Sequence, residues 1–411
     1  MELQKNIARG LKIKKPRLKR FGKYSWLTQG TGSLIKTIES AQIPCSGHPI
    51  TSSSPFDLLC TYNWRDARTP SIYVPGAPPR WEPRNLPVAI PQDRGKFFID
   101  EDAYRASEYP FEPLFQALSV MNPNFNFQDV DLVTNRNSLR KLFDFAEGRT
   151  CQSFRIDLNL VNETLFLTRR ERKARTVLRG TNRSNGFGHG FEQMFSKRSP
   201  PLEDSSGHYR VITYPLGPLK CVIRFEVDAY CDSNDDLPPQ GQASPASSDE
   251  SVAPSPESLS LQERETRETP GSINVIRRGH VIPCAATAEI KSRSKFLGPT
   301  GTMPQLWFGR TPHLLCGIHK DGVIEQIKER NCAPQFQEWE VRHQTGLRKL
   351  VQLIEELRQT TTLAENRSCV AVFEKTVKPS VLKIFSFSKT RPVLPKAIIA
   401  RYWRDPPRQN V

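Results

Sequence analysis

Three short fragments of the chain carry carboxylates and a lysine of the types that suit phosphodiester chemistry. Glu192 ends the fragment Gly-Phe-Glu, Asp228 ends Arg-Phe-Glu-Val-Asp, and Lys291 ends Ala-Glu-Ile-Lys. Carboxylate oxygens are ligands that Mg²⁺ and Mn²⁺ prefer, and such an ion lowers the pKa of a bound water and neutralises charge on a phosphoryl group. The fragments therefore predict one metal site with three candidate ligands: Glu192, Asp228 and Glu289.

Alternation along two predicted strands places these charges on one face of each strand. Over residues 219–229 the apolar side chains take the odd positions, which leaves the opposite face to Arg224, Glu226 and Asp228. Over residues 284–291, Glu289 and Lys291 alternate with Ala288 and Ile290. We expect both charged faces to line one cleft, with Lys291 holding the attacking water or stabilising the pentavalent phosphate.

The pattern Glu-x-Lys is weak when it is taken alone. Exposed strand charges that form salt bridges are the alternative interpretation of the same triplet. Wider features of the sequence are therefore needed to choose between a site and a solvated strand.

Composition limits the choice of fold and partner. The 411 residues are 37% hydrophobic and include 34 Pro and 23 Gly, which predicts one folded catalytic domain with unpacked additions. The net charge of +16 favours a polyanionic partner, although a basic but merely soluble protein is the alternative. Nine cysteines without a C-x-x-C pair indicate reduced thiols and neither a disulfide framework nor a zinc ribbon.

Charge and composition also mark the boundaries of the chain's parts. Residues 1–50 are predicted to be a basic, largely disordered segment, because residues 1–30 hold nine Lys or Arg against Glu2. Residues 232–270 are predicted to be a disordered acidic insertion, since nine acidic and two basic residues stand there among Ser and Pro. Residues 51–231 and 271–405 are then expected to form the single catalytic domain.

The folded parts are expected to be α+β, with a two-sheet mixed αβ core around a cleft. Periodicity predicts helices over 108–121, 138–145 and 336–359 and a hairpin over 154–168 that turns at Asn162 and Glu163. The long helix 336–359 carries an apolar stripe and is assigned to packing.

A basic run over residues 169–183 holds seven Lys or Arg against Glu171. It either steers an RNA backbone or is a solvated loop. Four residues of this run are predicted to bind phosphate: Arg170, Arg172, Lys173 and Arg175. The family resemblance described below adds Arg136 and Lys141 to this set.

No run of apolar residues approaches the roughly 18 that a membrane span needs, and the N-terminus lacks a secretory signal. We therefore expect a soluble protein with no membrane partner. The basic cluster over residues 12–20 predicts the nucleus, with the cytoplasm or a mitochondrion as alternatives.

Taken in order, the motifs resemble the DXO family of 5′-end decapping enzymes and exoribonucleases. Thr134-Asn-Arg136 precedes the hairpin, and Gly188-His-Gly-Phe-Glu192, Glu226-Val-Asp228, Glu289-Ile-Lys291 and Gln305-Leu-Trp-Phe follow it. The resemblance runs from about residue 129 to 322. It implies a deep cleft, two divalent ions (Mg²⁺ or Mn²⁺), an RNA 5′ end as substrate, a partner exoribonuclease and a monomer.

The resemblance also implies a role for individual residues. Arg136 would contact RNA phosphate, and Lys291 and Gln305 would sit against the scissile phosphate. The catalytic set is then Glu192, Asp228, Glu289, Lys291 and Gln305, with Glu226 joining Glu192, Asp228 and Glu289 as a metal ligand. Asn137 and Gly190 depart from the family's pattern, and these departures bear on the choice of substrate.

The chain also resembles a filamentous-fungal branch of that family whose members are sometimes labelled geranylgeranyl pyrophosphate synthetase. Prenyl synthases need two Asp-rich helical motifs, whereas the one adjacent pair here, Asp235 and Asp236, stands in the acidic insertion before two prolines. The residues do not support that label. Two function classes remain: a metal-dependent RNA 5′-end hydrolase, or a catalytically weak relative that binds RNA or protein through the same cleft.

Overall fold

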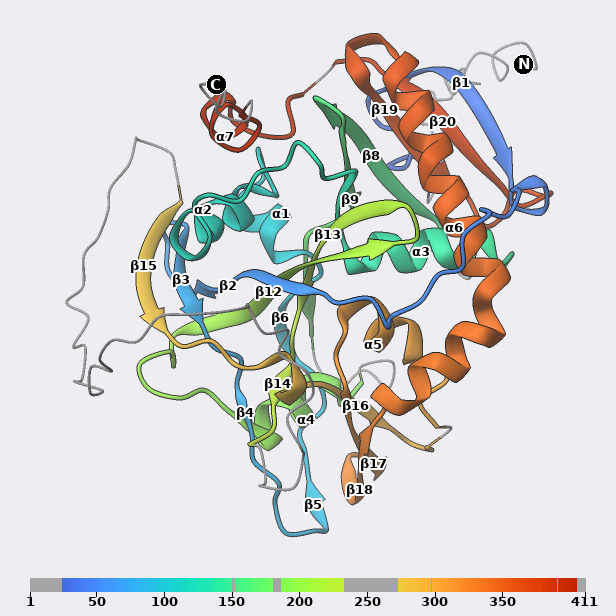
Figure 1. Cartoon of the computed structure of the whole chain (residues 1–411). Coiled ribbons are helices and arrows are strands. Elements are labelled where there is room, and N and C mark those ends of the chain that lie inside the picture. Colours follow the sequence, from blue (N-terminus) through green and yellow to red (C-terminus); the bar gives the residue numbers. More distant parts are fainter. Residues whose placement is uncertain are drawn as a thin grey trace, which may run out of the picture.

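The computed structural model describes residues 24–149, 152–179, 186–232, 273–296, 298–389 and 391–404. Two large mixed sheets and a two-stranded sheet make up most of the described chain, together with seven α-helices (Figure 1). No helix in these ranges is both long enough and apolar enough to span a membrane.

The larger sheet has eleven strands, and neighbouring strands come from distant parts of the chain. Their order across the sheet is β1 (Thr31–Glu39), β20 (Val381–Phe387), β19 (Ser368–Phe373), β8 (Phe154–Val161), β9 (Thr164–Arg170), β7 (Leu132–Asn135), β13 (Leu219–Glu226), β12 (Ser205–Leu216), β2 (Asp57–Arg65), β3 (Ser71–Gly76) and β15 (Asn274–Gly279). The short strand β7 runs parallel to both of its neighbours, β9 and β13. It delivers the chain directly into the helix that comes next.

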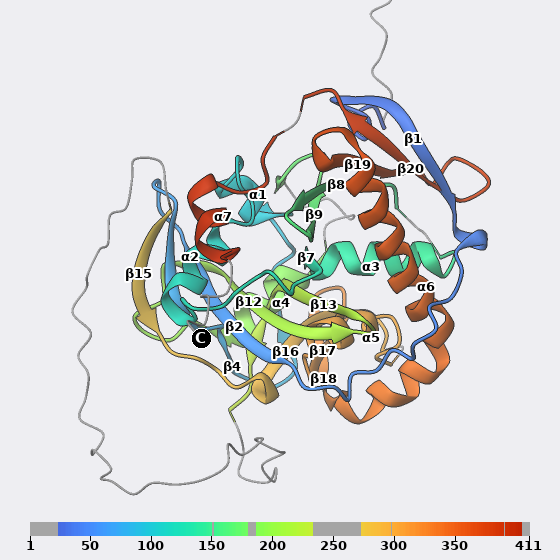
Figure 2. The ribbon, with the colours of Figure 1, turned by 45° about the horizontal axis from the view of Figure 1, so that its top comes forward.

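Helices cover both faces of this sheet. One apolar core joins it to α3 (Arg136–Ala146), α5 (Met303–Gly309) and the long α6 (Phe336–Leu363). A second core joins the other face to α2 (Glu112–Met121) and α7 (Lys396–Tyr402). Figures 1 and 2 both place α7 beside α2 and away from α6. Because both faces are covered, Val222 and Ile223 are each fully buried although they point to opposite sides of β13.

The smaller sheet has seven strands and a separate apolar core. Its order is β11 (Ser196–Lys197), β4 (Arg80–Trp81), β14 (Ala229–Tyr230), β16 (Thr287–Arg293), β17 (His313–Lys320), β18 (Val323–Asn331) and β5 (Val88–Ala89). Helix α4 (Gly188–Phe195) packs Phe191 and Phe195 against Ala288 and Ile290 of this sheet. The two-stranded sheet pairs β6 (Gly95–Phe98) with β10 (Arg175–Leu178), and α1 (Glu101–Arg105) follows β6.

Most of the expected elements are present. The hairpin over 154–168 forms as β8 and β9, and its turn passes through Asn162, which has a φ of 50°. The helix expected over 336–359 is α6, and its apolar stripe is buried as predicted. The helix expected from residue 138 begins at Arg136, and the helix expected from 108 begins at Glu112.

Two expected boundaries are wrong. The strand expected over 219–229 ends at Glu226, because the chain crosses there from the larger sheet to β14 of the smaller one. The segment 1–50 is not uniformly outside the fold, since β1 pairs antiparallel with β20 and buries Ile38 in the core. Residues 1–23 and nearly all of the acidic insertion 232–270 lie outside the described residues.

Candidate active site

The link between the two sheets brings Asp228 and Glu289 together around Lys291. Glu226 ends β13, and Asp228 lies in the two-residue connection before β14. Strand β14 pairs with β16 at Ala229 and Ala288, so the next residue of β16, Glu289, is placed beside the connection. Residues from distant parts of the sequence therefore meet where the larger sheet passes into the smaller one.

Glu289 is the most enclosed carboxylate of this cluster, with only 1% of its side chain exposed. Its Oε1 accepts hydrogen bonds from Lys291 Nζ and Gln305 Nε2. Its Oε2 lies 3.2 Å from Nη2 of Arg136. Burial alone would raise the pKa of Glu289, but Lys291 and Arg136 lower it more, so this carboxyl is ionised.

Asp228 is held by the backbone of the neighbouring strand. Its Oδ2 accepts a hydrogen bond of 2.8 Å from the Ile290 backbone N–H and lies 3.5 Å from Lys291 Nζ. Burial and the charge of Glu289 raise its pKa well above the ordinary value. The same two carboxylates raise the pKa of Lys291, although burial alone would lower it. Lys291 is thus a fixed positive charge between two acids.

Helices α3 and α5 bring the cationic and amide groups of the site. Arg136 is the first residue of α3, and its guanidinium also donates to the backbone carbonyls of Glu226 (3.2 Å) and Gln305 (3.4 Å). It lies over the ring of Phe225 at 4.9 Å. A Cβ at Gly309 would lie 2.8 Å from Arg136 Nη1, so the glycine allows this approach.

Arg140 stands one helical turn after Arg136 and donates to Oε1 of Gln305 at 3.1 Å. A single glutamine therefore joins the two arginines of α3 to Glu289. Gln305 is oriented from both of its amide atoms, since Nε2 donates to the carboxylate and Oε1 accepts from Arg140.

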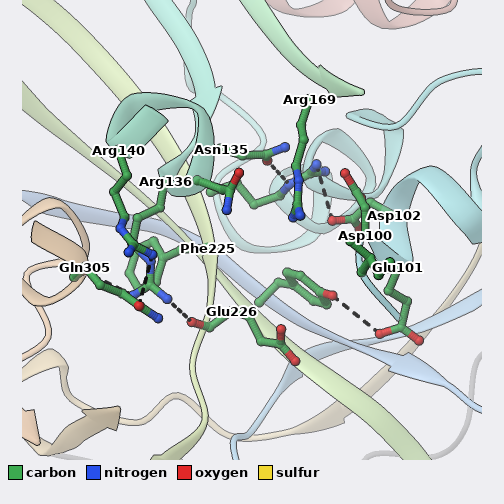
Figure 3. Close-up of a pocket in the computed structure, with 14 residues that line it drawn as sticks. Asp100, Glu101, Asp102, Asn135, Arg136, Arg140, Arg169, Phe225, Glu226 and Gln305 are labelled. Carbon is green, nitrogen blue, oxygen red and sulfur yellow. Dashed lines mark hydrogen bonds and ion pairs between the residues drawn. The ribbon is translucent and has the colours of Figure 1, made fainter. Parts of the chain in front are cut away.

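A pocket of about 170 Å³ opens beside this cluster. Figure 3 shows Arg136, Arg140 and Gln305 on one side and the acidic residues of α1 and its cap on the other, with Glu226 between them. Arg169 of β9 extends into the same space (Figure 3). The pocket also exposes Asn137, whose Oδ1 is buried and has no partner among the described residues.

Glu226 is open to solvent through this pocket, yet protein surrounds it on its other sides. That burial raises its pKa to about 8, and three carboxylates add to the rise: Glu101, Glu192 and Glu289. A cation bound near Glu226 would relieve this repulsion. The chemistry of the donor set therefore fits a hard cation.

Glu192 approaches the cluster from α4 without a direct contact to it among the described residues. Its Oε2 lies 3.6 Å from Nδ1 of His189, and this neighbouring carboxylate raises the pKa of His189. The start of α4 is fixed by Asp93, which accepts from the backbone N–H groups of Gly188 (3.1 Å) and Gly190 (3.0 Å). A Cβ at Gly190 would lie 2.3 Å from the carbonyl oxygen of Pro91, which explains the glycine there.

The arrangement as it stands is an ion-paired cluster. Nowhere in the described ranges do three His, Cys, Asp or Glu side chains meet in a group able to hold a metal ion. Glu289 is occupied by Arg136, Lys291 and Gln305, so its oxygens would have to exchange partners before they could bind a cation. The carboxylates are of a type that fits a divalent ion, and in this structure Glu289 is paired with cationic and amide side chains.

The basic residues predicted to bind phosphate are divided among different surroundings. Lys141 pairs with Glu171 at 2.8 Å and Arg170 with Asp157 at 2.9 Å. Arg175, the first residue of β10, lies over the ring of Tyr104 in α1. Arg172 and Lys173 are exposed. Of the six predicted residues, only Arg136 lines the pocket beside Glu226.

Sequence reasoning missed the acidic wall of the pocket. Asp100 caps α1 by accepting from Ala103 N at 3.0 Å, and Glu101 and Asp102 come next, buried. Burial raises the pKa of both Glu101 and Asp102. The run Asp-Glu-Asp is typical of a helix N-terminus and could have predicted the start of α1. The position of Arg140, one helical turn after Arg136, could have predicted that both side chains lie on the same face of α3.

Arg224 also has a role that strand alternation alone did not reveal. It shares a face of β13 with Glu226 as predicted, but it pairs with Asp102 at 3.3 Å and with Oδ1 of Asn135 at 2.9 Å. It therefore anchors α1 against the sheet.

This fold is that of the Rai1 proteins. Scheffersomyces stipitis Rai1 is similar at a TM-score of 0.54 and 11% identity, covering 89% of this chain and 99% of that one. S. pombe Rai1 in complex with 3′-FADP gives 0.51 and 12% identity, covering 85% and 98%. Candida albicans Rai1 in complex with pU5 and Mn²⁺ gives 0.51 and 9% identity, covering 90% and 99%.

By sequence, the chain belongs to the family described as a domain of unknown function, DUF8563, which matches residues 33–403. None of the curated proteins compared with the chain matches it.

Proposed function

We propose that this protein is a metal-dependent hydrolase of RNA 5′ ends, of the decapping, pyrophosphohydrolase or 5′-to-3′ exoribonuclease type. The observation that carries the proposal is the cluster in which Arg136, Lys291 and Gln305 converge on Glu289 beside a pocket that opens onto Glu226. The fold shared with Rai1 proteins and the order of the sequence motifs support it.

Glu192, Glu226, Asp228 and Glu289 would hold one or two divalent ions, which supply a Lewis acid and a water of lowered pKa when bound. The remaining steps fall to the chain's own side chains. Arg136 and Arg140, next to each other on α3, bind and orient the 5′-terminal phosphate in the pocket. Lys291 places a fixed positive charge where negative charge grows on the phosphoryl oxygens.

Gln305 acts as a positioning residue in this proposal. Its amide donates to Glu289 and accepts from Arg140. It therefore fixes the position of the acid relative to the phosphate-binding arginine. The pocket wall of α1 would limit which groups can lie next to the terminal phosphate, since a further anion would meet Glu101. This wall is the part of the site that we expect to select among 5′ ends.

Replacing Lys291 with Ala tests the role of this side chain. We expect turnover to fall by about two to three orders of magnitude, the scale for loss of one preorganised contact in the transition state, with Mn²⁺ affinity retained. Single-turnover kinetics and Mn²⁺ titration measure the two quantities separately. Unchanged turnover in this variant would remove Lys291 from the chemistry.

A catalytically weak RNA- or protein-binding relative is the second candidate. The observation that favours it is the occupation of Glu289 by Arg136, Lys291 and Gln305, which opposes its release to an ion. Binding of RNA without hydrolysis at saturating Mn²⁺ is the outcome that would support it.

We also propose a nuclear location, action as a monomer and a partner exoribonuclease. These proposals depend on the sequence and its resemblance, and the basic cluster over residues 12–20 lies outside the described residues.

A further inference from the structure

A second pocket, of about 520 Å³, lies next to the site pocket, and its charged lining residues are six positive side chains and the two acids Asp100 and Glu171. It is bounded by residues 26–30, by the end of β9 and the residues after it, and by residues 387–389 and Arg391 after the end of β20. We call it the basic groove, defined by six side chains: Arg155, Arg169, Arg170, Arg172, Lys389 and Arg391.

Among the described residues, much of the positive charge in the basic groove has no carboxylate to neutralise it. Arg155 and Arg170 share one carboxylate, that of Asp157, at 2.7 Å and 2.9 Å, and Arg169 pairs with Glu171 at 2.7 Å. Arg172, Lys389 and Arg391 have no carboxylate partner in the part of the chain that the structure describes. An excess of cations in a concave surface attracts a polyanion.

The groove is built into the fold. Arg155 in β8 is buried, with 7% of its side chain exposed, and it donates to the backbone carbonyls of Leu27 and Gln29. These bonds fix the segment before β1 against the sheet. The groove therefore has a defined wall and is more than a row of surface charges.

Two aromatic side chains also face the groove. Trp26 and Phe387 line it and are each half-buried, packed against the small apolar core of Leu27, Val370 and Val372. Aromatic rings beside a positive groove provide stacking surfaces for unpaired bases, whereas the bases of a duplex are already stacked on one another.

The groove adjoins the site pocket. Asp100 and Arg169 line both hollows. Arg169 extends into the site pocket in Figure 3, while its neighbour Arg170 belongs to the groove alone. A chain whose terminal phosphate lies beside Arg136 can therefore run past Arg169 into the groove.

We infer that the basic groove binds the single-stranded RNA downstream of a 5′ end held in the site pocket. The inference deepens the proposed function and rests on it. Phosphates of the strand contact Arg172, Lys389 and Arg391, and one or more bases stack on Trp26 or Phe387. Of these five residues, the sequence alone had indicated Arg172.

The test compares two variants that remove positive charge from different parts of the surface. Arg172→Ala/Lys389→Ala/Arg391→Ala removes the free cations of the groove, and Lys375→Ala/Lys378→Ala removes exposed lysines before β20 begins. We measure binding of three ligands at several salt concentrations. They are a fluorescent single-stranded 12-mer RNA with a 5′ monophosphate, a matching RNA duplex and uridine monophosphate. Unchanged thermal unfolding shows that both variants fold.

We expect the groove variant to bind the 12-mer at least tenfold more weakly, with a salt dependence shallower by about two units, since each single-strand phosphate contact contributes about 0.7. Trp26→Ala should lose roughly tenfold of the affinity for the 12-mer as well. Binding of uridine monophosphate should be unchanged in every variant, because the mononucleotide does not reach the groove.

The outcomes separate this inference from the proposed function. A groove variant that binds the 12-mer as tightly as the Lys375→Ala/Lys378→Ala control overturns the inference, whether or not the protein hydrolyses RNA. An equal loss for the duplex and the single strand overturns the assignment to single-stranded RNA. If the wild type binds the 12-mer through the groove and never cleaves it, the inference stands and the proposed hydrolase does not.

Discussion

Glu289 accepts hydrogen bonds from three side chains, and each donor belongs to a different element of the fold. Lys291 comes from its own strand, Arg136 from the start of α3, and Gln305 from α5. A carboxylate that is 1% exposed requires this degree of compensation, because an unpaired buried charge costs several kcal/mol. The same contacts that stabilise the fold thus prearrange the groups that the proposed chemistry needs.

Removing Arg136 should therefore be costly for stability. We expect Arg136→Ala to lower the free energy of unfolding by about 3 kcal/mol, the lower end for a broken buried pair because Lys291 remains. Denaturant unfolding of the wild type, the variant and the double variant Arg136→Ala/Glu289→Gln measures it. The double variant should recover part of the loss. An Arg136→Ala protein as stable as the wild type would show that Arg136 does not compensate Glu289.

At the scale of elements, the crossing of the chain from β13 to β14 determines the site. It lies beside β12, whose His208 is buried and joined through Nδ1 to Oδ1 of Asn63 at 2.7 Å. The carbonyl of His208 accepts from the backbone N–H of Val227, directly between Glu226 and Asp228. A change at this histidine therefore reaches both carboxylates through the backbone.

Burial, together with the charge of Arg210, lowers the pKa of His208 well below its ordinary value near 6.5. Below pH 6.5 the unfolded chain binds a proton that the folded protein does not, so the free energy of unfolding falls as the pH falls. This one group contributes up to about 1.4 kcal/mol per pH unit. In His208→Gln, the free energy of unfolding measured in urea should therefore fall less between pH 7 and pH 5 than it does in the wild type. Equal pH dependence in both proteins would contradict it.

Strand β1 gives the second prediction at this scale. Ile38 is 5% exposed and packs into the core under β20, whereas Leu34 of the same strand is 52% exposed. We expect Ile38→Ala to lower the free energy of unfolding by about 2 kcal/mol or more, and Leu34→Ala to change it by less than about 0.5 kcal/mol. If thermal unfolding shows that Ile38→Ala destabilises the protein as little as Leu34→Ala, then β1 does not belong to the folded domain.

The elements that could be predicted from sequence are those with strong local periodicity. The stripe of α6, the alternation of β8 and β9 and the pairing of Glu289 with Lys291 on one strand face were all readable. The end of β13 at Glu226 was not, because Val227 continues the apolar alternation while the chain is already leaving the sheet. Strand β1 was missed because its burial depends on β20, near the other end of the chain, and its own residues are mostly exposed.

The candidate site shows the same division. The alternation and spacing of the sequence indicated Glu192, Asp228, Glu289 and Lys291, and the family resemblance added Glu226 and Gln305. Their partners came from tertiary contacts that no local pattern encodes, such as the bond from Gln305 to Arg140 and the wall formed by Asp100, Glu101 and Asp102.

On the scale of the whole molecule, two sheets with separate cores meet at one small cluster of acidic and basic side chains. Six positive side chains of this basic chain lie next to it, in a groove that shares Arg169 with the site pocket. A basic groove leading to a pocket with arginines on one side and carboxylates on the other suits a polyanion whose end is processed. The arrangement unites the charge of the chain, its fold and its proposed chemistry.

The most direct test incubates the purified protein with Mn²⁺ and RNAs that carry a monophosphate, a triphosphate, an unmethylated cap or a nicotinamide cap at the 5′ end. We expect release of the 5′ group or shortening of the strand for at least one of these RNAs, and complete loss of the activity in excess chelator and in Asp228→Ala, with the fold retained. Products that persist in chelator or in Asp228→Ala, or four RNAs that all remain intact with the wild type, would contradict the account of a metal-dependent RNA 5′-end hydrolase.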